Sequence, residues 1–250
     1  MFLLDAIQKQ ISELIKQSPD AAKNPMKYVR EAIQGYGKEQ LNKAISNCNV
    51  CNCKCKTRTL FTGAADADLM IIMDYPTFEQ AEADKPIEVF DNNKKVKKFV
   101  LDCFKKHNVN IDRLAFINAV NCCLSRTVQA KNGTREEYRT PLIKERDECQ
   151  DFVKYAVDVV HPPMMIIMGN VASNIYIPKT AISEIHGKWQ SVYCIPTMVT
   201  YSPHEINDYH ALSIEKAVQM LTQFKEDIDN AIKCYKRLWP NSKLFADDNE

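Results

Sequence analysis

The sequence predicts a protein of the α/β class, a three-layer α/β/α sandwich around a four-stranded parallel sheet. Three five-residue runs, at 69–73, 114–118 and 164–168, are apolar with little or no alternation. Such runs are typical of strands that are buried on both faces. A fourth strand is expected from Ile195 to Thr200. Helical sequence of ten or more residues separates the strands, and this alternation favours βαβ units with a parallel central sheet.

The carboxyl ends of these strands are the expected location of a functional site. The first run enters the loop Asp74-Tyr75-Pro76-Thr77, and the last enters Tyr201-Ser202-Pro203-His204. Ligands bind where the carboxyl ends of parallel strands meet at one edge of a sheet.

Length and composition agree with one sizeable core. The chain has 250 residues, of which 45% are hydrophobic, so it can form a single domain with small extensions. We expect a helical extension over 1–46, a main domain over 47–240 and an acidic tail over 241–250. The formal net charge is +1, so a nucleic acid would have to be bound by a local basic face.

Helices are predicted on both sides of the strands. Apolar residues recur at helical spacing over 2–17. A second helix is expected over 26–36, ending at Gly35-Tyr36-Gly37, and a short third one over 38–45. We interpret this N-terminal segment as a packing layer rather than a partner-binding arm. A long amphipathic helix is predicted over 213–238, packed on the sheet.

The N-terminus predicts a soluble, cytoplasmic protein that does not enter a membrane. Met1-Phe2-Leu3-Leu4 lacks the charged start of a secretory signal, and Asp5, Lys9 and Glu13 interrupt any apolar span. In a reducing compartment the ten cysteines are not expected to form disulfides.

Four cysteines form two distant pairs, Cys48 with Cys51 and Cys122 with Cys149. Four thiolates that converge inside a cell usually hold a metal ion or an iron-sulfur cluster. Cys53 and Cys55 allow an alternative, in which zinc is held within the segment 48–55, although such tight spacing would strain a tetrahedral site.

Two segments are rich in basic residues. The segment 92–107 alternates six lysines with apolar residues, which fits either a solvated helix face or a surface that meets phosphates. The segment Ser125–Thr140 has few apolar groups and is expected to be an exposed basic loop.

Seven segments follow one another in a characteristic order: Cys48-x-x-Cys51, Asp74-Tyr75-Pro76, Phe116-Ile117-Asn118-Ala119-Val120-Asn121-Cys122, Cys149, Met168-Gly169-Asn170-Val171-Ala172, Ile182 to Trp189, and Tyr201-Ser202-Pro203. Together they resemble the iron-sulfur uracil-DNA glycosylases of family 4, from about Cys48 to Leu221. The resemblance implies a 4Fe-4S cluster on Cys48, Cys51, Cys122 and Cys149, with DNA as the partner. It also implies hydrolysis of the bond between deoxyribose and a flipped uracil.

The same resemblance assigns roles at the strand ends. Asn118 would read the base, and Asp74 stands where the family has a glutamate that positions water. Ser202 replaces the histidine that stabilises the leaving base, so His204 is the candidate for that role. The position of the aromatic residue that stacks on uracil falls near Ile87, with Phe90 and Tyr75 as substitutes. The first-motif glycines are replaced by Met73 and Thr77, and Ser125–Thr140 resembles an insertion.

Two hypotheses follow from these departures. In the first, the protein is an active glycosylase on uracil or a modified pyrimidine, with Asp74, Asn118 and His204 carrying the reaction. In the second, it is a catalytically silent DNA-binding accessory subunit that meets a replication or transcription protein. A third class, a zinc-stabilised protein-interaction domain, would give a colourless protein.

Overall fold

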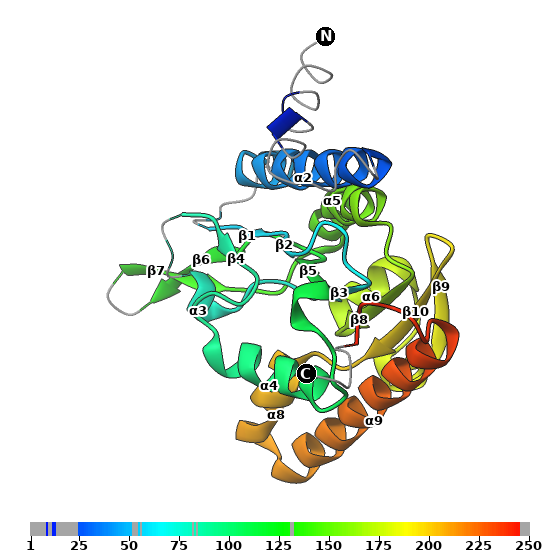
Figure 1. The fold of residues 1–250 in the computed structure, drawn as a ribbon. Coiled ribbons are helices and arrows are strands. Elements are labelled where there is room, and N and C mark those ends of the chain that lie inside the picture. The colour runs from blue at the N-terminus through cyan, green and yellow to red at the C-terminus, as the bar shows by residue number, and fades with distance from the viewer. Residues whose placement is uncertain are drawn as a thin grey trace.

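A six-stranded mixed sheet lies at the centre of the molecule (Figure 1). The computed structural model describes residues 9, 12–13, 25–51, 55, 57–81, 83, 85–130 and 133–245. The strand order is β2-β5-β3-β8-β10-β9. The strands are β2 (Thr62–Gly63), β5 (Leu114–Asn118), β3 (Leu69–Met73), β8 (Met164–Met168), β10 (Ile195–Thr200) and β9 (Trp189–Val192).

The four inner strands are parallel and are the four that the sequence predicts. The sheet nevertheless has six strands, because β2 and β9 pair antiparallel with its outer members. These edge strands are short and partly exposed, so they lack the continuous apolar run that marks a buried strand. Met73 aligns with both Asn118 and Met168, and Thr200 aligns with Met168. The four carboxyl ends therefore lie at one edge.

Helices cover both faces of the sheet. In Figure 1, α2 and α5 lie on one side of the strands, and α4, α8 and α9 lie on the other. The helices are α2 (Pro25–Ser46), α3 (Phe78–Ala81), α4 (Lys94–Lys105), η1 (Ile111–Arg113), α5 (Ile143–Val160), α6 (Asn170–Tyr176), α7 (Ile182–Ile185), α8 (Pro203–Leu212) and α9 (Ile214–Leu238). Among the described residues, no helix is long and apolar enough to cross a membrane.

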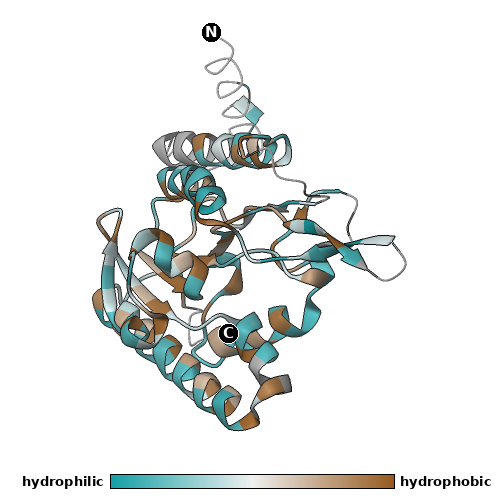
Figure 2. Cartoon of the chain, turned by 180° about the vertical axis from the view of Figure 1, so that it is seen from behind, coloured by the Kyte–Doolittle hydropathy of each residue, from teal (hydrophilic) through white to brown (hydrophobic). Residues whose placement is uncertain are grey.

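The long helix α9 buries the apolar face that its sequence pattern predicts. Its N-cap is Ser213, whose hydroxyl oxygen accepts a hydrogen bond from the Lys216 backbone N–H. Phe224 and Ile228 are fully buried on one face, whereas Figure 2 shows hydrophilic and hydrophobic segments alternating along the helix. The predicted amphipathic helix over 213–238 is confirmed.

The prediction that a helix ends at Gly35-Tyr36-Gly37 is wrong. The helix α2 runs without a break from Pro25 to Ser46 and places Leu41 and Ile45 in the main core. A Cβ atom at Gly37 would lie 2.7 Å from Val159 Cγ2, so glycine allows α2 to approach α5 closely. The apolar residues of the helix predicted over 2–17 lie outside the described residues.

Two further predicted segments are more ordered than expected. The basic loop Ser125–Thr140 contains a hairpin of β6 (Ser125–Ala130) and β7 (Gly133–Tyr138). Its charges are partly paired, because the Arg126 guanidinium lies 2.6 Å from the Glu137 carboxylate.

The start of the predicted tail also packs against the domain, since Leu244 is fully buried. Residues 246–250 lie outside the described residues.

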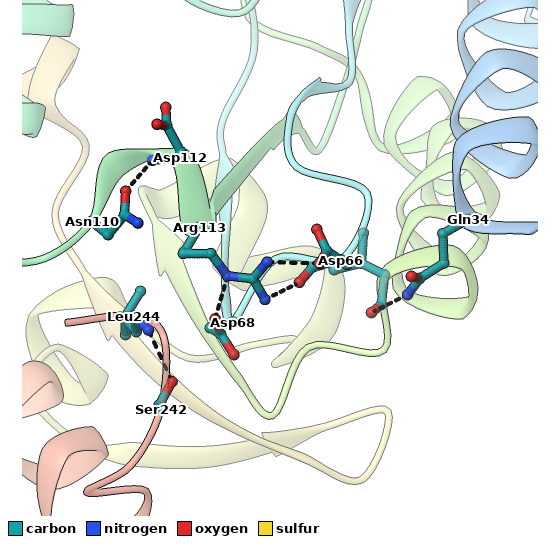
Figure 3. A network of polar contacts seen from close by, with 9 residues as sticks. Gln34, Asp66, Asp68, Asn110, Asp112, Arg113, Ser242 and Leu244 are labelled. Carbon is teal, nitrogen blue, oxygen red and sulfur yellow. Dashed lines mark hydrogen bonds and ion pairs between the residues drawn. The ribbon is translucent and has the colours of Figure 1, made fainter. Parts of the chain in front are cut away.

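A network of ion pairs holds the amino-terminal edge of the sheet (Figure 3). The Arg113 Nε atom lies 2.6 Å from Asp68 and its Nη1 atom lies 2.6 Å from Asp66, both just before β3. A cavity of about 400 Å³ opens beside this edge and is lined in part by Asp68, Tyr235 and Trp239. It lies at the end of the strands opposite to the predicted functional residues.

Candidate active site at the carboxyl edge of the sheet

Asp74 is the carboxylate at the centre of the carboxyl edge, directly after β3. Its side chain is buried, and its Oδ1 atom accepts a 2.7 Å hydrogen bond from the Ala172 backbone N–H in the first turn of α6. Burial raises the pKa of Asp74 to about 7, and the negative charge of Glu205 contributes in the same direction. Near neutral pH this group can therefore hold or release a proton.

Gly169 makes room for this carboxylate. It connects β8 to α6 with a φ of +117°, a conformation that favours glycine, and its N–H donates to the Thr200 carbonyl at 2.9 Å. A Cβ atom at this position would overlap the carboxylate of Asp74. The motif Met168-Gly169-Asn170 thus forms one wall of the site.

Asn118 ends β5 beside Asp74 and is 2% exposed. Its Nδ2 atom donates to Thr59 Oγ1 at 2.7 Å, and the Thr59 hydroxyl donates to the Asn121 carbonyl at 3.4 Å. Because that hydroxyl proton points toward the carbonyl, Thr59 accepts from Asn118, which fixes the orientation of the amide. Within the described part of the chain this is the one side-chain hydrogen bond of Asn118, so one N–H and the Oδ1 atom are available to a ligand.

His204 lies in the first turn of α8 and faces the N-cap of α4. Asn93 Oδ1 accepts from the Val96 backbone N–H at 3.3 Å, which turns Asn93 Nδ2 toward His204 Nδ1 at 3.3 Å. An amide nitrogen only donates, so Nδ1 accepts and the imidazole proton lies on Nε2. Burial lowers the pKa of His204 to about 4, against an opposing effect of Glu79. The imidazole is therefore neutral at physiological pH.

Other groups make this edge acidic. Burial raises the pKa values of Glu205 and Asp208 on α8. Ser202 is 3% exposed, and its backbone carbonyl accepts from the Ile206 N–H at 3.1 Å. Ser202 thus lies at the start of α8, close in sequence to His204 and Glu205.

The three residues predicted for base stacking separate in space. Ile87 is buried in β4 (Ile87–Glu88), opposite Thr59 of β1 (Thr59–Leu60), and therefore lies near Asn118. Phe90 instead packs edge-on against Phe116 at 4.9 Å and lines a cavity of about 380 Å³ beside α4. Tyr75 packs against the cluster that contains Cys122 and Cys149.

Two of the four predicted cysteine ligands lie together beside this edge, and the chain links a third to them. Cys122 and Cys149 are buried in one small apolar cluster, and Cys55 packs against it. The Cys48 carbonyl accepts a 2.6 Å hydrogen bond from the Arg58 guanidinium, while the backbone of Arg58 pairs with that of Cys122. The fold thus links the first cysteine segment to the second.

Iron-sulfur clusters are held by cysteine thiolates, commonly in a largely apolar setting. The residue type and the surroundings of these cysteines therefore suit an iron-sulfur cluster. Among the residues that the structure describes, no three His, Cys, Asp or Glu side chains are arranged to hold a metal ion. Cys53 lies outside those residues, so the alternative of zinc held within 48–55 stays a prediction.

Sequence reasoning missed three residues of this edge as site members: Thr59, Asn93 and Asn121. Thr59 carries no motif signal, because its importance comes from pairing across 59 residues of chain with Asn118. Asn93 precedes the lysine-rich helix, so its capping position was a usable signal. Asn121 stands within the quoted motif but received no role.

Comparison of the chain with models of known protein families and with curated proteins finds no match.

Proposed function

We propose that this protein is a uracil-DNA glycosylase-like enzyme, which takes uracil or a modified pyrimidine out of the DNA stack and hydrolyses its N-glycosidic bond. One observation carries the proposal: a buried carboxylate whose pKa is about 7, Asp74, and a buried amide with free hydrogen-bonding capacity, Asn118, lie at the ends of adjacent parallel strands.

Asp74 has the chemistry that the sugar side of this reaction needs. When it is ionised, its carboxylate can orient a water molecule and stabilise the positive charge that develops on deoxyribose as the bond to the base lengthens. The hydrogen bond from the Ala172 N–H holds the carboxylate at the start of α6.

His204 supports the base side of the reaction. A neutral imidazole with its proton on Nε2 is a hydrogen-bond donor, so it can stabilise the negative charge of the departing base. Asn93 fixes that tautomer through Nδ1. Asn118 would recognise the base, since its amide both donates and accepts and so matches the adjacent carbonyl and imide groups of uracil.

Binding to DNA is supported by the first turns of α4. Lys94, Lys95 and Lys97 are exposed there, next to the N-cap Asn93 that contacts His204. Lysines beside a base pocket can contact the phosphates that flank a flipped nucleotide.

We further propose that Cys48, Cys51, Cys122 and Cys149 hold a 4Fe-4S cluster. Such a cluster would supply a rigid structural tie between the loops that follow α2 and β5. The contact from Arg58 to the Cys48 carbonyl already brings these loops together.

A second candidate function is a catalytically silent DNA-binding subunit of replication or transcription. It is favoured by the position of Asp74, whose Oδ1 atom is engaged by the backbone of α6, and by Ser202 at the place of the expected histidine.

Incubation with an oligonucleotide containing one uracil, followed by alkaline strand scission, separates the two candidates. The enzyme proposal predicts cleavage at the uracil by the wild type and its loss in Asp74→Asn. DNA binding without an abasic product would support the silent subunit. The exposed carboxylate Asp147 on α5 offers a matched control, because Asp147→Asn should leave cleavage unchanged.

A further inference from the structure

Asn121 carries a buried amide with no partner among the residues that the structure describes. Its side chain is 1% exposed, and neither Nδ2 nor Oδ1 makes a hydrogen bond within the described part of the chain. Buried polar groups are nearly always paired, because an unpaired donor or acceptor has lost water without replacement. An amide with both ends unpaired therefore indicates a missing polar partner.

The backbone shows which way this amide faces. Arg58 and Cys122 lie opposite each other in an antiparallel bridge. The bridge is flanked by hydrogen bonds from Thr59 N–H to the Asn121 carbonyl, at 2.8 Å, and from Cys123 N–H to the Thr57 carbonyl, at 3.2 Å. Thr59 is thus directly opposite Asn121, and paired side chains in such a ladder lie on the same face.

Alternation along the chain gives the same result. Val120, Cys122 and Leu124 belong to the cysteine cluster. Successive side chains of an extended segment point to opposite faces, so Asn121 lies on the other face. That face holds Thr59, which accepts from Asn118, and Ile87, which pairs with Thr59 in register.

The chemistry of the base gives this amide a partner. The edge of uracil presents an acceptor, a donor and an acceptor in order, namely O2, N3–H and O4. One amide supplies one donor and one acceptor on one side, so Asn118 alone leaves a base carbonyl unpaired. Asn121 has a spare N–H on the same face of the protein.

We propose that Asn121 is a second base-reading residue, whose Nδ2 donates to the uracil carbonyl that Asn118 does not satisfy. This inference rests on the proposed function and adds a specificity-determining residue to it. The unpaired amide is retained because the bound pyrimidine completes its hydrogen bonding.

The test uses the full-length protein and a single-stranded oligonucleotide with one 2′-fluoro-deoxyuridine, which resists hydrolysis. The same oligonucleotide with thymine measures non-specific binding. Asn121→Leu should lower the ratio of the two affinities at least tenfold, while its melting temperature and iron content stay at or above those of wild type. Asn121→Asp, which exchanges the donor for acceptors, should lower the same ratio, because its carboxylate cannot donate to the base carbonyl and repels it.

Asn42 on α2 provides the matched control. Its amide is paired at both ends with the backbone of Phe61, at 3.1 and 2.9 Å. Asn42→Leu should therefore lower the melting temperature and keep the affinity ratio. An unchanged ratio in both Asn121 variants would overturn the inference, whatever happens to stability. If the wild type itself does not prefer uracil, the proposed function fails first and the inference fails with it.

Discussion

The carboxylate of Asp74 occupies the space that a side chain on Gly169 would need. The two residues directly follow the adjacent parallel strands β3 and β8. The left-handed φ of Gly169 lets the backbone turn into α6 beside the carboxylate. The backbone conformation at Gly169 therefore helps to determine where the Asp74 carboxylate lies.

The first prediction is that Gly169→Ala destabilises the protein more than Gly133→Ala. Both glycines have a positive φ, but only Gly169 faces an occupied space. Backbone strain should cost each variant about 1–3 kcal/mol, and displacement of Asp74 should cost Gly169→Ala roughly 2 kcal/mol more. Urea denaturation measures both losses, and equal losses would contradict the contact between Gly169 and Asp74.

The second prediction concerns the pH dependence of Asp74. Its pKa is 3.8 in the reference state and about 7 in the fold, so the native protein binds the proton more tightly. The contribution of this group to stability therefore falls as pH rises from about 4 to 7. Asp74→Asn should gain roughly 3 kcal/mol relative to wild type between pH 5 and pH 8. Denaturant titrations at the two pH values measure this, and a constant difference would argue against the raised pKa.

The third prediction is that the contribution of His204 to stability falls as pH falls, opposite to that of Asp74. The pKa of His204 falls from 6.5 to about 4 on burial, so the unfolded chain binds the proton more tightly. Its contribution to stability is present above pH 6.5 and is lost as pH falls toward 4. Relative to His204→Gln, the wild type should lose roughly 2 kcal/mol between pH 7 and pH 4.5. In wild type alone this effect opposes that of Asp74, so each must be measured against its own variant.

The fourth prediction is that Asn118→Asp relaxes discrimination between uracil and cytosine. A carboxylate cannot donate, so the variant loses the contact to a base carbonyl and gains acceptors for the amino group of cytosine. Cleavage of matched uracil and cytosine oligonucleotides measures the ratio. Thr59→Val is a useful companion, because it removes the partner of Asn118 without changing the amide. An unaltered base preference in Asn118→Asp would mean that this amide is structural.

The fifth prediction tests the proposed 4Fe-4S cluster. Cys122→Ala should release iron and sulfide from anaerobically purified protein and lower its melting temperature, because metal binding is coupled to folding. Cys194 is exposed in the turn between β9 and β10, so Cys194→Ala should retain both. Iron and sulfide at wild-type levels in Cys122→Ala would rule out Cys122 as a ligand.

The central fold could be predicted because its signals are local. Three inner strands are short apolar runs, and all four have the same bounds in sequence and structure. The errors come from tertiary packing that overrides local preference. Gly37 reads as a helix terminator, yet it serves a close contact with Val159. The edge strands β2 and β9 depend on a neighbouring strand for their conformation.

The candidate site could be predicted only in part, for a related reason. Asp74 and Asn118 follow apolar runs, so their place at the sheet edge is readable from the chain. The partners that orient them come from distant segments: Thr59 for Asn118 and the N–H of Ala172 for Asp74. The unpaired state of Asn121 is a property of its surroundings, and no sequence pattern reports it.

The segment 120–124 also constrains how this protein can change over evolution. Its side chains point alternately toward the cysteine cluster and toward the face of Thr59. Losing or gaining one residue there would exchange the two sets, turning Cys122 toward the face of Thr59 and Asn121 toward the cysteine cluster. A single substitution changes one side chain and its own contacts. A change in the length of 120–124 would instead disturb both the cysteine cluster and the face of Thr59.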